Sequence, residues 1–293
     1  MRRMNHAPQA SAKSTPTAAV ASLHFAVLLF GFAGLFGKWI ALPAVTIAFG
    51  RTIVAAAALG TLLAMRGATR HRFEWRLATN GLLLATHWVA FFQAVQTASV
   101  AVALLGCASF PMFVLILDSL ILRRRPAAGQ WLSATIVAAG LALLVPAFDL
   151  SQRVVQGVLW GVFSGFTFAL LALGNRSLVQ RRPADEIAFW QNAIAAACLL
   201  PAVLLRPMMP SAMDLGAIVV LGLLCTALAH TLFIRSLRLV SAHVASIVAA
   251  LEPVYGIALA AMLLGEFPSA RTLSGATLII GATLWTSARG GQM

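Results

Sequence analysis

Two charged residues lie inside apolar runs of membrane-spanning length, where either could carry chemistry. Arg51 lies within IAFGRTIVAAA (residues 47–57), and Glu252 lies beside Pro253 within ALEPVYGIALAAMLLGE (residues 250–266). A guanidinium group binds a carboxylate through two hydrogen bonds, so Arg51 is a candidate clamp for an acidic substrate group. The alternative is a structural ion pair with Glu252, the other charge at comparable depth.

Glu252 itself has two interpretations. An intramembrane carboxylate can bind and release protons, which would couple transport to a proton gradient. Alternatively, Glu252 accepts hydrogen bonds at the helix break that Pro253 imposes. A related upstream stretch, GCASFPMFVLILDSLILRRR, has Pro111 at the place of Pro253 and Phe110 at the place of Glu252. Because the equivalent position in that stretch is not an acid, a structural role for Glu252 is favoured.

His87 is the best candidate for a polar group that contacts a ligand or relays a proton. A free histidine side chain titrates near neutral pH, and the neighbouring Trp88 and Phe91 make the apolar run partly aromatic. His230 lies in the equivalent run of the second half of the chain. The alternative for both is an ordinary hydrogen bond between helices.

Gln191 lies at the place in the second half that Arg51 occupies in the first half. An amide there could bind the other end of a zwitterion, or it could join two helices. The neighbouring Trp190 could stack on a substrate or only pack. The aromatic residues Phe110, Phe166 and Tyr255 complete the predicted site as candidate walls of an apolar cavity.

Composition restricts the class of protein. Hydrophobic residues make up 60% of the 293 residues and charged residues only 10%, with a mean hydropathy of +0.90. A soluble domain cannot bury so much apolar surface. No phosphate-binding loop, catalytic triad or metal-ligand cluster occurs, and the three cysteines lie in apolar runs without paired spacing. We therefore expect a membrane protein that is not an enzyme and uses no cofactor or metal.

The apolar runs predict ten membrane-spanning helices joined by short loops. Their expected positions are 19–37, 43–65, 77–96, 99–122, 130–147, 156–175, 186–205, 214–234, 241–264 and 271–288. With these spans, 16 of the 21 basic residues fall on one side of the membrane, together with both chain ends. Basic loops remain cytoplasmic, so both termini are predicted to be cytoplasmic, and the net charge of +13 reflects topology rather than nucleic-acid binding.

The chain contains an internal repeat. IAFGRTIVAAA (residues 47–57) matches IAFWQNAIAAA (residues 187–197), so the unit contains five spans. Because five is odd, the second copy crosses the membrane in the opposite direction. The expected organisation is a cytoplasmic tail at 1–18, a first repeat at 19–148 and a second repeat at 155–288. Substrate sites of such proteins lie at the repeat interface beside interrupted helices.

These features resemble the drug/metabolite transporter superfamily in its ten-helix EamA-type branch. The resemblance covers about residues 19–288 and depends most on LEPVYGIALAAMLLGE and on the prolines Pro111 and Pro253. Arg123–Arg125 depart from it, because they replace the Gly-Glu ending at Gly265–Glu266. The resemblance implies a monomeric secondary transporter of small metabolites, in a family that includes exporters of amino acids and aromatic amino acids.

The sequence therefore predicts an exporter of small metabolites, amino acids first, in a bacterial-type cytoplasmic membrane. A transporter of drugs or nucleotide sugars would share the same fold and remains an alternative. A channel is disfavoured because charged residues do not recur as rings along a pore.

Overall fold

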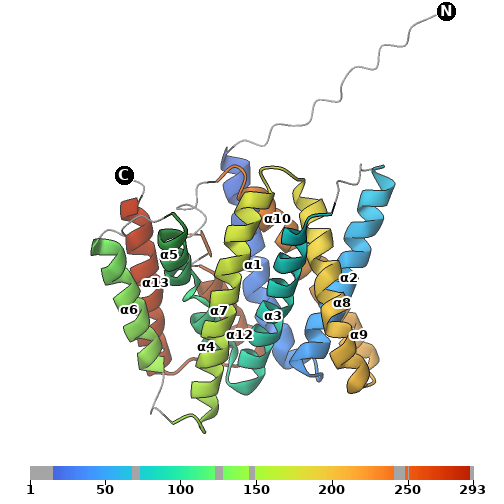
Figure 1. Cartoon of the computed structure of the whole chain (residues 1–293). Coiled ribbons are helices and arrows are strands. Elements are labelled where there is room, and N and C mark those ends of the chain that lie inside the picture. Colours follow the sequence, from blue (N-terminus) through green and yellow to red (C-terminus); the bar gives the residue numbers. More distant parts are fainter. Residues whose placement is uncertain are drawn as a thin grey trace, which may run out of the picture.

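The computed structural model describes residues 16–67, 73–122, 128–144, 149–240, 248–249 and 251–290, and these residues form helices without strands (Figure 1). The helices of the first half are α1 (Pro16–Trp39), α2 (Ala44–Met65), α3 (Trp75–Thr97), α4 (Val100–Cys107), α5 (Phe110–Leu122) and α6 (Ala128–Leu144). Those of the second half are α7 (Arg153–Leu178), α8 (Ala184–Leu205), α9 (Ala212–Gly222), η1 (Leu223–Leu228), α10 (Ala229–Ser236), α12 (Glu252–Leu264) and α13 (Ala270–Gly290).

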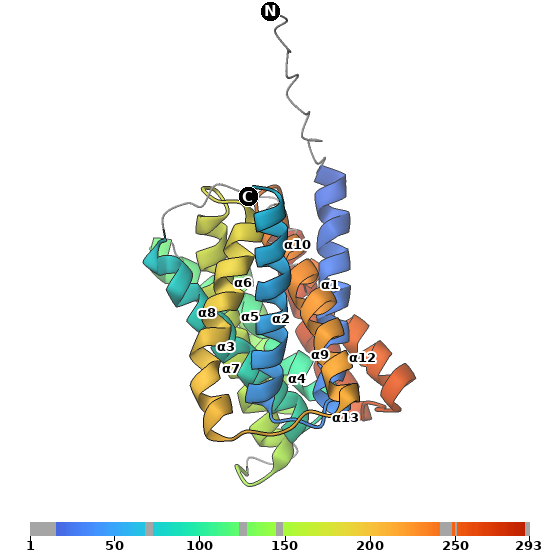
Figure 2. The same cartoon turned by 90° about the vertical axis from the view of Figure 1, so that its right-hand side faces the viewer.

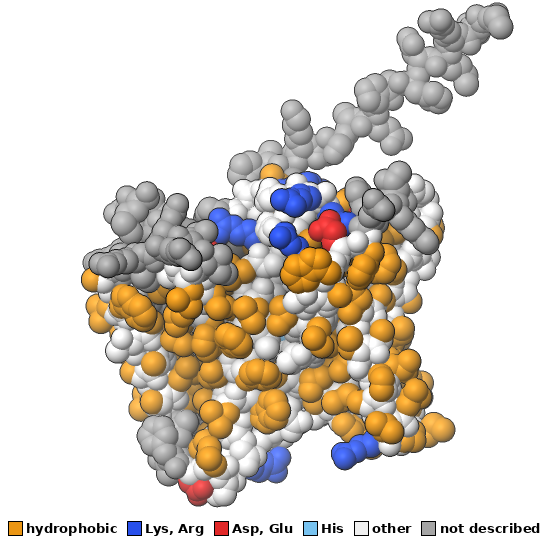
Figure 3. Space-filling view, in the orientation of Figure 1, with side chains coloured by type: hydrophobic (Ala, Val, Ile, Leu, Met, Phe, Trp, Pro, Cys, Tyr) orange, Lys and Arg blue, Asp and Glu red, His pale blue; other side chains and the backbone are white. Residues whose placement is uncertain are grey.

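The helices are those of a membrane-spanning bundle. Six helical stretches within the described residues are long and apolar enough to cross a bilayer, and α6 and α12 are shorter apolar helices. On the face shown in Figure 3, hydrophobic side chains cover the middle of the molecule, and charged side chains lie at its two ends. The protein is an all-α integral membrane protein.

Each predicted span corresponds to one helix or to one interrupted helix. The fourth span consists of α4 and α5, with the break at the predicted proline. The eighth span was expected to be a regular helix, but it consists of α9, the π-helix η1 and α10. Most of the first half of the ninth span and most of the tail at 1–18 lie outside the described residues, and α1 begins at Pro16 rather than at residue 19.

The two halves of the chain are inverted repeats of one another. Figure 1 shows α1 running down from the end where the N-terminus lies, whereas α7, the first helix of the second repeat, runs up toward that end. The helix contacts are paired accordingly. α2 packs against its repeat partner α8, and α6 packs against its repeat partner α13. The contact between α3 and α7 is equivalent to the one between α10 and α1. Likewise, the contact between α4 and α7 is equivalent to the one between α12 and α1.

Glycines allow two of these mirrored contacts to be close. A Cβ atom on Gly106 of α4 would lie 2.9 Å from Gly161 Cα of α7, and one on Gly31 of α1 would lie 2.9 Å from the Gly256 nitrogen of α12. Small residues let membrane helices approach until their backbones touch. These contacts hold α4 against α7 and α12 against α1, each close to a helix break.

Candidate functional site

Arg51 of α2 is fully buried. Its Nε atom donates to Thr226 Oγ1 at 2.8 Å, and its Nη2 atom donates to the Cys225 carbonyl oxygen at 3.0 Å. The guanidinium carbon lies 3.4 Å from the ring centroid of Trp88, an arrangement that favours a cation. Within the described residues, Nη1 has no hydrogen-bond partner. One end of the guanidinium is therefore fixed and the other remains available.

The partners of Arg51 come from the π-helix η1. Thr226 Oγ1 donates to the Leu221 carbonyl oxygen at 2.8 Å, which leaves its lone pairs to accept from Arg51. Single π-turns inside α-helices are rare and often occur at functional sites. The sequence contained no signal for this turn, because glycine and proline are absent from Leu223–Leu228.

His87 of α3 extends this cluster toward α7. Its Nδ1 atom lies 3.1 Å from the Ser164 carbonyl oxygen, and its ring stacks on Phe168 with centroids 4.9 Å apart. A carbonyl oxygen only accepts, so this contact favours a proton on Nδ1. The His87 ring also lies 4.6 Å from that of Trp88, which connects it to Arg51. The predicted grouping of His87, Trp88 and Phe91 is therefore present, with all three buried.

His230 of α10 belongs to the same cluster. It is buried and within electrostatic range of Arg51 and His87, and neither of its ring nitrogens has a partner among the described residues. The indole Nε1 of Trp88 is also unpaired there. Buried polar atoms are normally hydrogen-bonded, so these nitrogens and Arg51 Nη1 are groups that a ligand with acceptor oxygens could satisfy. We call Arg51, His87, Trp88, Thr226 and His230 the central cluster.

The two helix breaks meet beside this cluster. α5 begins at Phe110 and α12 begins at Glu252, and both residues line one small cavity together with their neighbouring prolines. The ring of Phe110 lies 5.3 Å from that of Phe168, which stacks on His87. Glu252 lies in the first turn of α12, where the helix dipole favours a negative charge.

The ion pair between Arg51 and Glu252 is not formed. Arg51 instead contacts the hydroxyl of Thr226 and the carbonyl of Cys225, and no ion pair of the described residues joins it to Glu252. Arg51 is therefore a buried cation whose protein partners are neutral. This arrangement leaves its charge without a counter-charge among the described residues.

Gln191 lies in a different polar group. Its Nε2 atom donates to Asn175 Oδ1, and Asn80 Nδ2 donates to the same oxygen at 3.1 Å. The three amides join α8, α7 and α3, and all are buried. We call Asn80, Asn175 and Gln191 the amide cluster. Sequence analysis did not single out Asn80 and Asn175, although amides inside apolar runs are the signal for such contacts.

Three further candidates lie away from the central cluster or at its margin. Trp190 packs against Phe73, with ring centroids 5.4 Å apart, and Phe166 packs against Phe113 at 5.3 Å. Trp190 and Phe166 have no ring contact with His87 or Trp88 in the part of the chain that the structure describes. Tyr255 is partly buried against the core beside α1. Thr226 and Phe168, by contrast, contact the core of the site.

The sequence matches a family of known membrane proteins. The EamA-like transporter family is matched twice, over residues 17–145 and residues 155–288, which together make up most of the chain. The protein belongs to the EamA-like transporter family. Its members and the relatives below are named as transporters, so the protein is a membrane transporter and not an enzyme.

Relatives of this EamA-like transporter have different named substrates. An uncharacterised transporter of Bacillus subtilis, YxxF, is 24% identical and covers 98% of this chain and 94% of its own length. An S-adenosylmethionine uptake transporter of Rickettsia bellii is 26% identical over 70% of each chain. The pseudopaline exporter CntI of Pseudomonas aeruginosa is 25% identical over 83% of this chain and 86% of its own.

One solved crystal structure of a protein has the same fold. It superposes with a TM-score of 0.70 at 18% sequence identity and covers 94% of this chain and 100% of its own. At this identity the likeness concerns the fold alone.

Proposed function

We propose that this EamA-like transporter exports small carboxylate-bearing metabolites, amino acids first, by alternating access around Arg51. The observation that carries the proposal is the state of the Arg51 guanidinium, which is fully buried, fixed by neutral partners and unpaired at Nη1. Burying a cation without a counter-charge is costly, so a carboxylate is the ligand group that this position favours most.

The rest of the central cluster fits an amino-acid-like substrate. Trp88, Phe91 and Phe168 supply aromatic surface beside Arg51 and His87, and the unpaired nitrogens of Trp88 and His230 can donate to further oxygens. Ligand sites commonly combine apolar walls with a few polar anchors. The relatives named for S-adenosylmethionine and pseudopaline also carry metabolites, and S-adenosylmethionine has a free α-carboxylate.

We propose that the protein lies in the inner membrane of a bacterial-type cell, with both chain ends in the cytoplasm. We call the end at which α1 begins and α13 ends the arginine-rich end. Among the described residues it carries Arg66, Arg76, Arg176, Arg181, Arg182, Arg235 and Arg238, whereas the opposite end carries Lys38, Arg153, Arg206 and Arg271. Positive charge is retained on the cytoplasmic side of bacterial membranes. The transport unit would be a monomer, because the central cluster is built from one chain.

The two ends differ in a way that suits alternating access. At the end opposite the arginine-rich one, Lys38 lies 3.6 Å from Glu266, whose Oε2 atom also accepts from the Val100 backbone N–H. Nearby, Asp214 accepts from the Ala41 backbone N–H. At the arginine-rich end, a pocket of about 390 Å³ lies between α2, α8 and α10. In the proposed cycle the bonds of the opposite end open when those around the pocket close.

Transport assays in proteoliposomes test the proposal. The purified protein is reconstituted and supplied with a panel of labelled amino acids and their amides, with and without a pH gradient. We expect transport of at least one amino acid and weak transport of its amide, because the amide lacks the charge that Arg51 binds. Arg51→Gln should lower kcat/KM for the acid about 100-fold, since losing the partner of a buried charged hydrogen bond typically costs about 2–5 kcal/mol.

Two controls make the result specific. Arg206→Gln removes an arginine at the opposite end of the molecule and should leave transport unchanged. Arg51→Lys keeps the charge but loses the planar guanidinium, so it should recover only part of the activity. Equal transport of acid and amide, or full activity in Arg51→Gln, would exclude the carboxylate clamp.

A further inference from the structure

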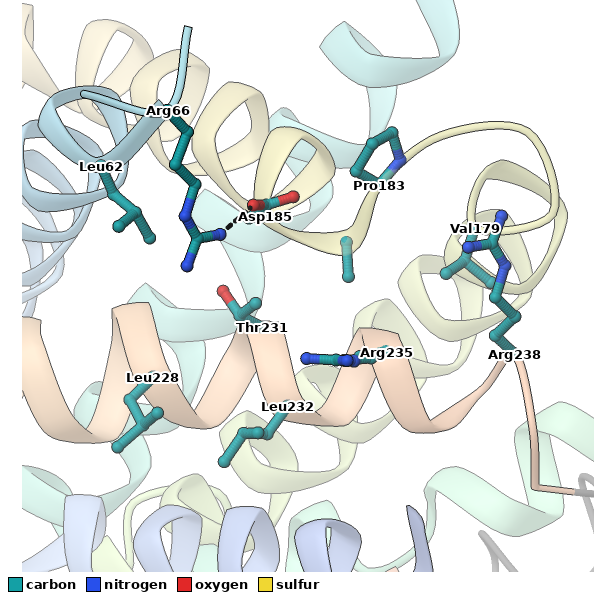
Figure 4. A pocket seen from close by; sticks show the side chains of 11 residues that line it. Leu62, Arg66, Val179, Pro183, Asp185, Leu228, Thr231, Leu232, Arg235 and Arg238 are labelled. Carbon is teal, nitrogen blue, oxygen red and sulfur yellow. Dashed lines mark hydrogen bonds and ion pairs between the residues drawn. The ribbon is translucent and has the colours of Figure 1, made fainter. Parts of the chain in front are cut away.

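The pocket at the arginine-rich end has an unusual lining (Figure 4). Its basic residues are Arg66 of α2 and, on and just after α10, Arg235 and Arg238. Its remaining lining is largely apolar, with Leu62, Leu228 and Leu232 among the contributors. The pocket therefore combines a cationic part with an apolar part.

These two parts follow one another from the end of η1, through α10, to the turn after it. Leu228, Leu232, Arg235 and Arg238 are three or four residues apart, so they form a single stripe that runs from the middle of the bundle toward its arginine-rich end. Leu228 is 39% exposed, and Arg235 and Arg238 are also exposed. In Figure 2, α10 lies near the same end of the molecule as the end of α2. The stripe thus changes from apolar to cationic in the direction in which a bilayer changes from acyl chains to headgroups.

Several polar groups of the pocket lack a side-chain partner among the described residues. Arg66 donates to Asp185 at 3.1 Å, but neither Arg235 nor Arg238 has a side-chain acceptor in the described part of the chain. Thr231 Oγ1 is buried and unpaired among the described residues, and Figure 4 shows its hydroxyl on the pocket side of α10, facing Arg66 and Asp185. The pocket holds three cationic side chains against one carboxylate, so its net charge is positive.

We propose that this pocket binds the phosphate headgroup of an anionic phospholipid from the cytoplasmic leaflet. Arg235 and Arg238 would contact the phosphate, Thr231 would donate to one of its oxygens, and an acyl chain would lie along Leu228 and Leu62. Basic pockets between membrane helices on the cytoplasmic side suit such headgroups. A soluble anion would use the arginines but would gain nothing from the apolar stripe, which is why a lipid is the favoured ligand.

Ligand-dependent melting of the purified protein in a neutral detergent tests this site. The protein is titrated separately with dioctanoyl phosphatidylglycerol, dioctanoyl phosphatidylcholine and glycerol 3-phosphate. Phosphatidylglycerol should raise Tm the most and the zwitterionic lipid less, while glycerol 3-phosphate should have no effect at the same concentration. Arg235→Gln/Arg238→Gln should need on the order of 30-fold more phosphatidylglycerol, because each basic residue near an anionic surface contributes about fivefold.

Matched variants separate loss of the site from loss of the fold. Arg206→Gln, at the opposite end, should respond as the wild type does. Thr231→Phe fills the pocket without removing charge, so it should weaken the response even if the double variant melts too early to measure. An unchanged response in both pocket variants would overturn the proposal. An equal response to glycerol 3-phosphate would also overturn it, because the pocket would then serve a soluble anion.

Discussion

Arg51 and Gln191 occupy equivalent places in the two repeats, and the structure surrounds them in opposite ways. Arg51 on α2 keeps its charge against a hydroxyl, a carbonyl and an indole face, with one nitrogen unpaired. The Nε2 atom of Gln191 on α8 is bonded within a neutral network with Asn175 and Asn80, while its Oε1 atom has no partner among the described residues. Arg51 is therefore a buried charge without a counter-charge among the described residues, whereas Gln191 joins three helices through neutral amides. An inverted repeat with this asymmetry can have two similar conformations but only one charged anchor.

The largest expected effect comes from placing a charge on the amide side. Gln191 is fully buried, so Gln191→Arg would place an uncompensated charge in the interior. This substitution should lower the free energy of unfolding by about 3–5 kcal/mol. Gln191→Met keeps the site neutral and is the size-matched control. Thermal and denaturant melts of both variants measure the difference, and a normal Tm for Gln191→Arg would remove the contrast between the two clusters.

Removing the shared acceptor of the amide cluster should destabilise the protein. Asn175→Leu leaves the Nε2 of Gln191 and the Nδ2 of Asn80 without the oxygen to which both donate. Hydrogen bonds between membrane helices contribute up to about 1–2 kcal/mol each, so the expected loss of stability is about 1–3 kcal/mol. Transport per folded molecule should be retained. A loss of transport without a loss of stability would instead place the amide cluster in the substrate path.

We expect no energetic coupling between Arg51 and Glu252. The stabilities of Arg51→Gln, Glu252→Gln and the double variant form a cycle whose coupling energy should be below about 0.5 kcal/mol, because Arg51 makes its polar contacts with Thr226 and Cys225 instead. Arg51→Gln alone should fold as well as the wild type, since no buried carboxylate is left unpaired. A coupling of several kcal/mol would restore the structural ion pair.

The smallest effect is a pH dependence at the arginine-rich end of α3. Glu74 precedes α3 and accepts from Arg182 at 2.9 Å, and this hydrogen bond lowers the pKa of Glu74 below its ordinary value of 4.5. A lowered pKa in the folded state gives stability that is present above pH 4.5 and is lost as pH falls through the lowered value. Tm should therefore fall less below pH 4.5 in Glu74→Gln than in the wild type. Parallel Tm curves would show that the ion pair makes no net contribution.

Much of the fold follows from the sequence because the membrane makes the constraints local. A helix that crosses a bilayer must satisfy its own backbone and present apolar side chains to lipid, so run length and loop charge are enough to place the spans. The matching segments 47–57 and 187–197 and the two prolines then predict the inverted repeat and the paired helix breaks. Intramembrane charge also identified Arg51 as a candidate, since a charge there requires a reason.

The direction in which each polar side chain points was decided by tertiary structure alone. Arg51 and Gln191 have the same place in the repeat, yet η1 presents Thr226 and Cys225 to one of them, while α3 and α7 present amides to the other. Trp190 and Phe166 are aromatic, as residues that line apolar cavities often are. In the structure, however, Trp190 packs against Phe73 and Phe166 packs against Phe113. Hydropathy fixes how deep a residue lies in the bilayer, but it does not fix which neighbouring helix that residue faces. The facing helix depends on close packing between segments far apart in the chain, and a single π-turn changes it for every residue that follows.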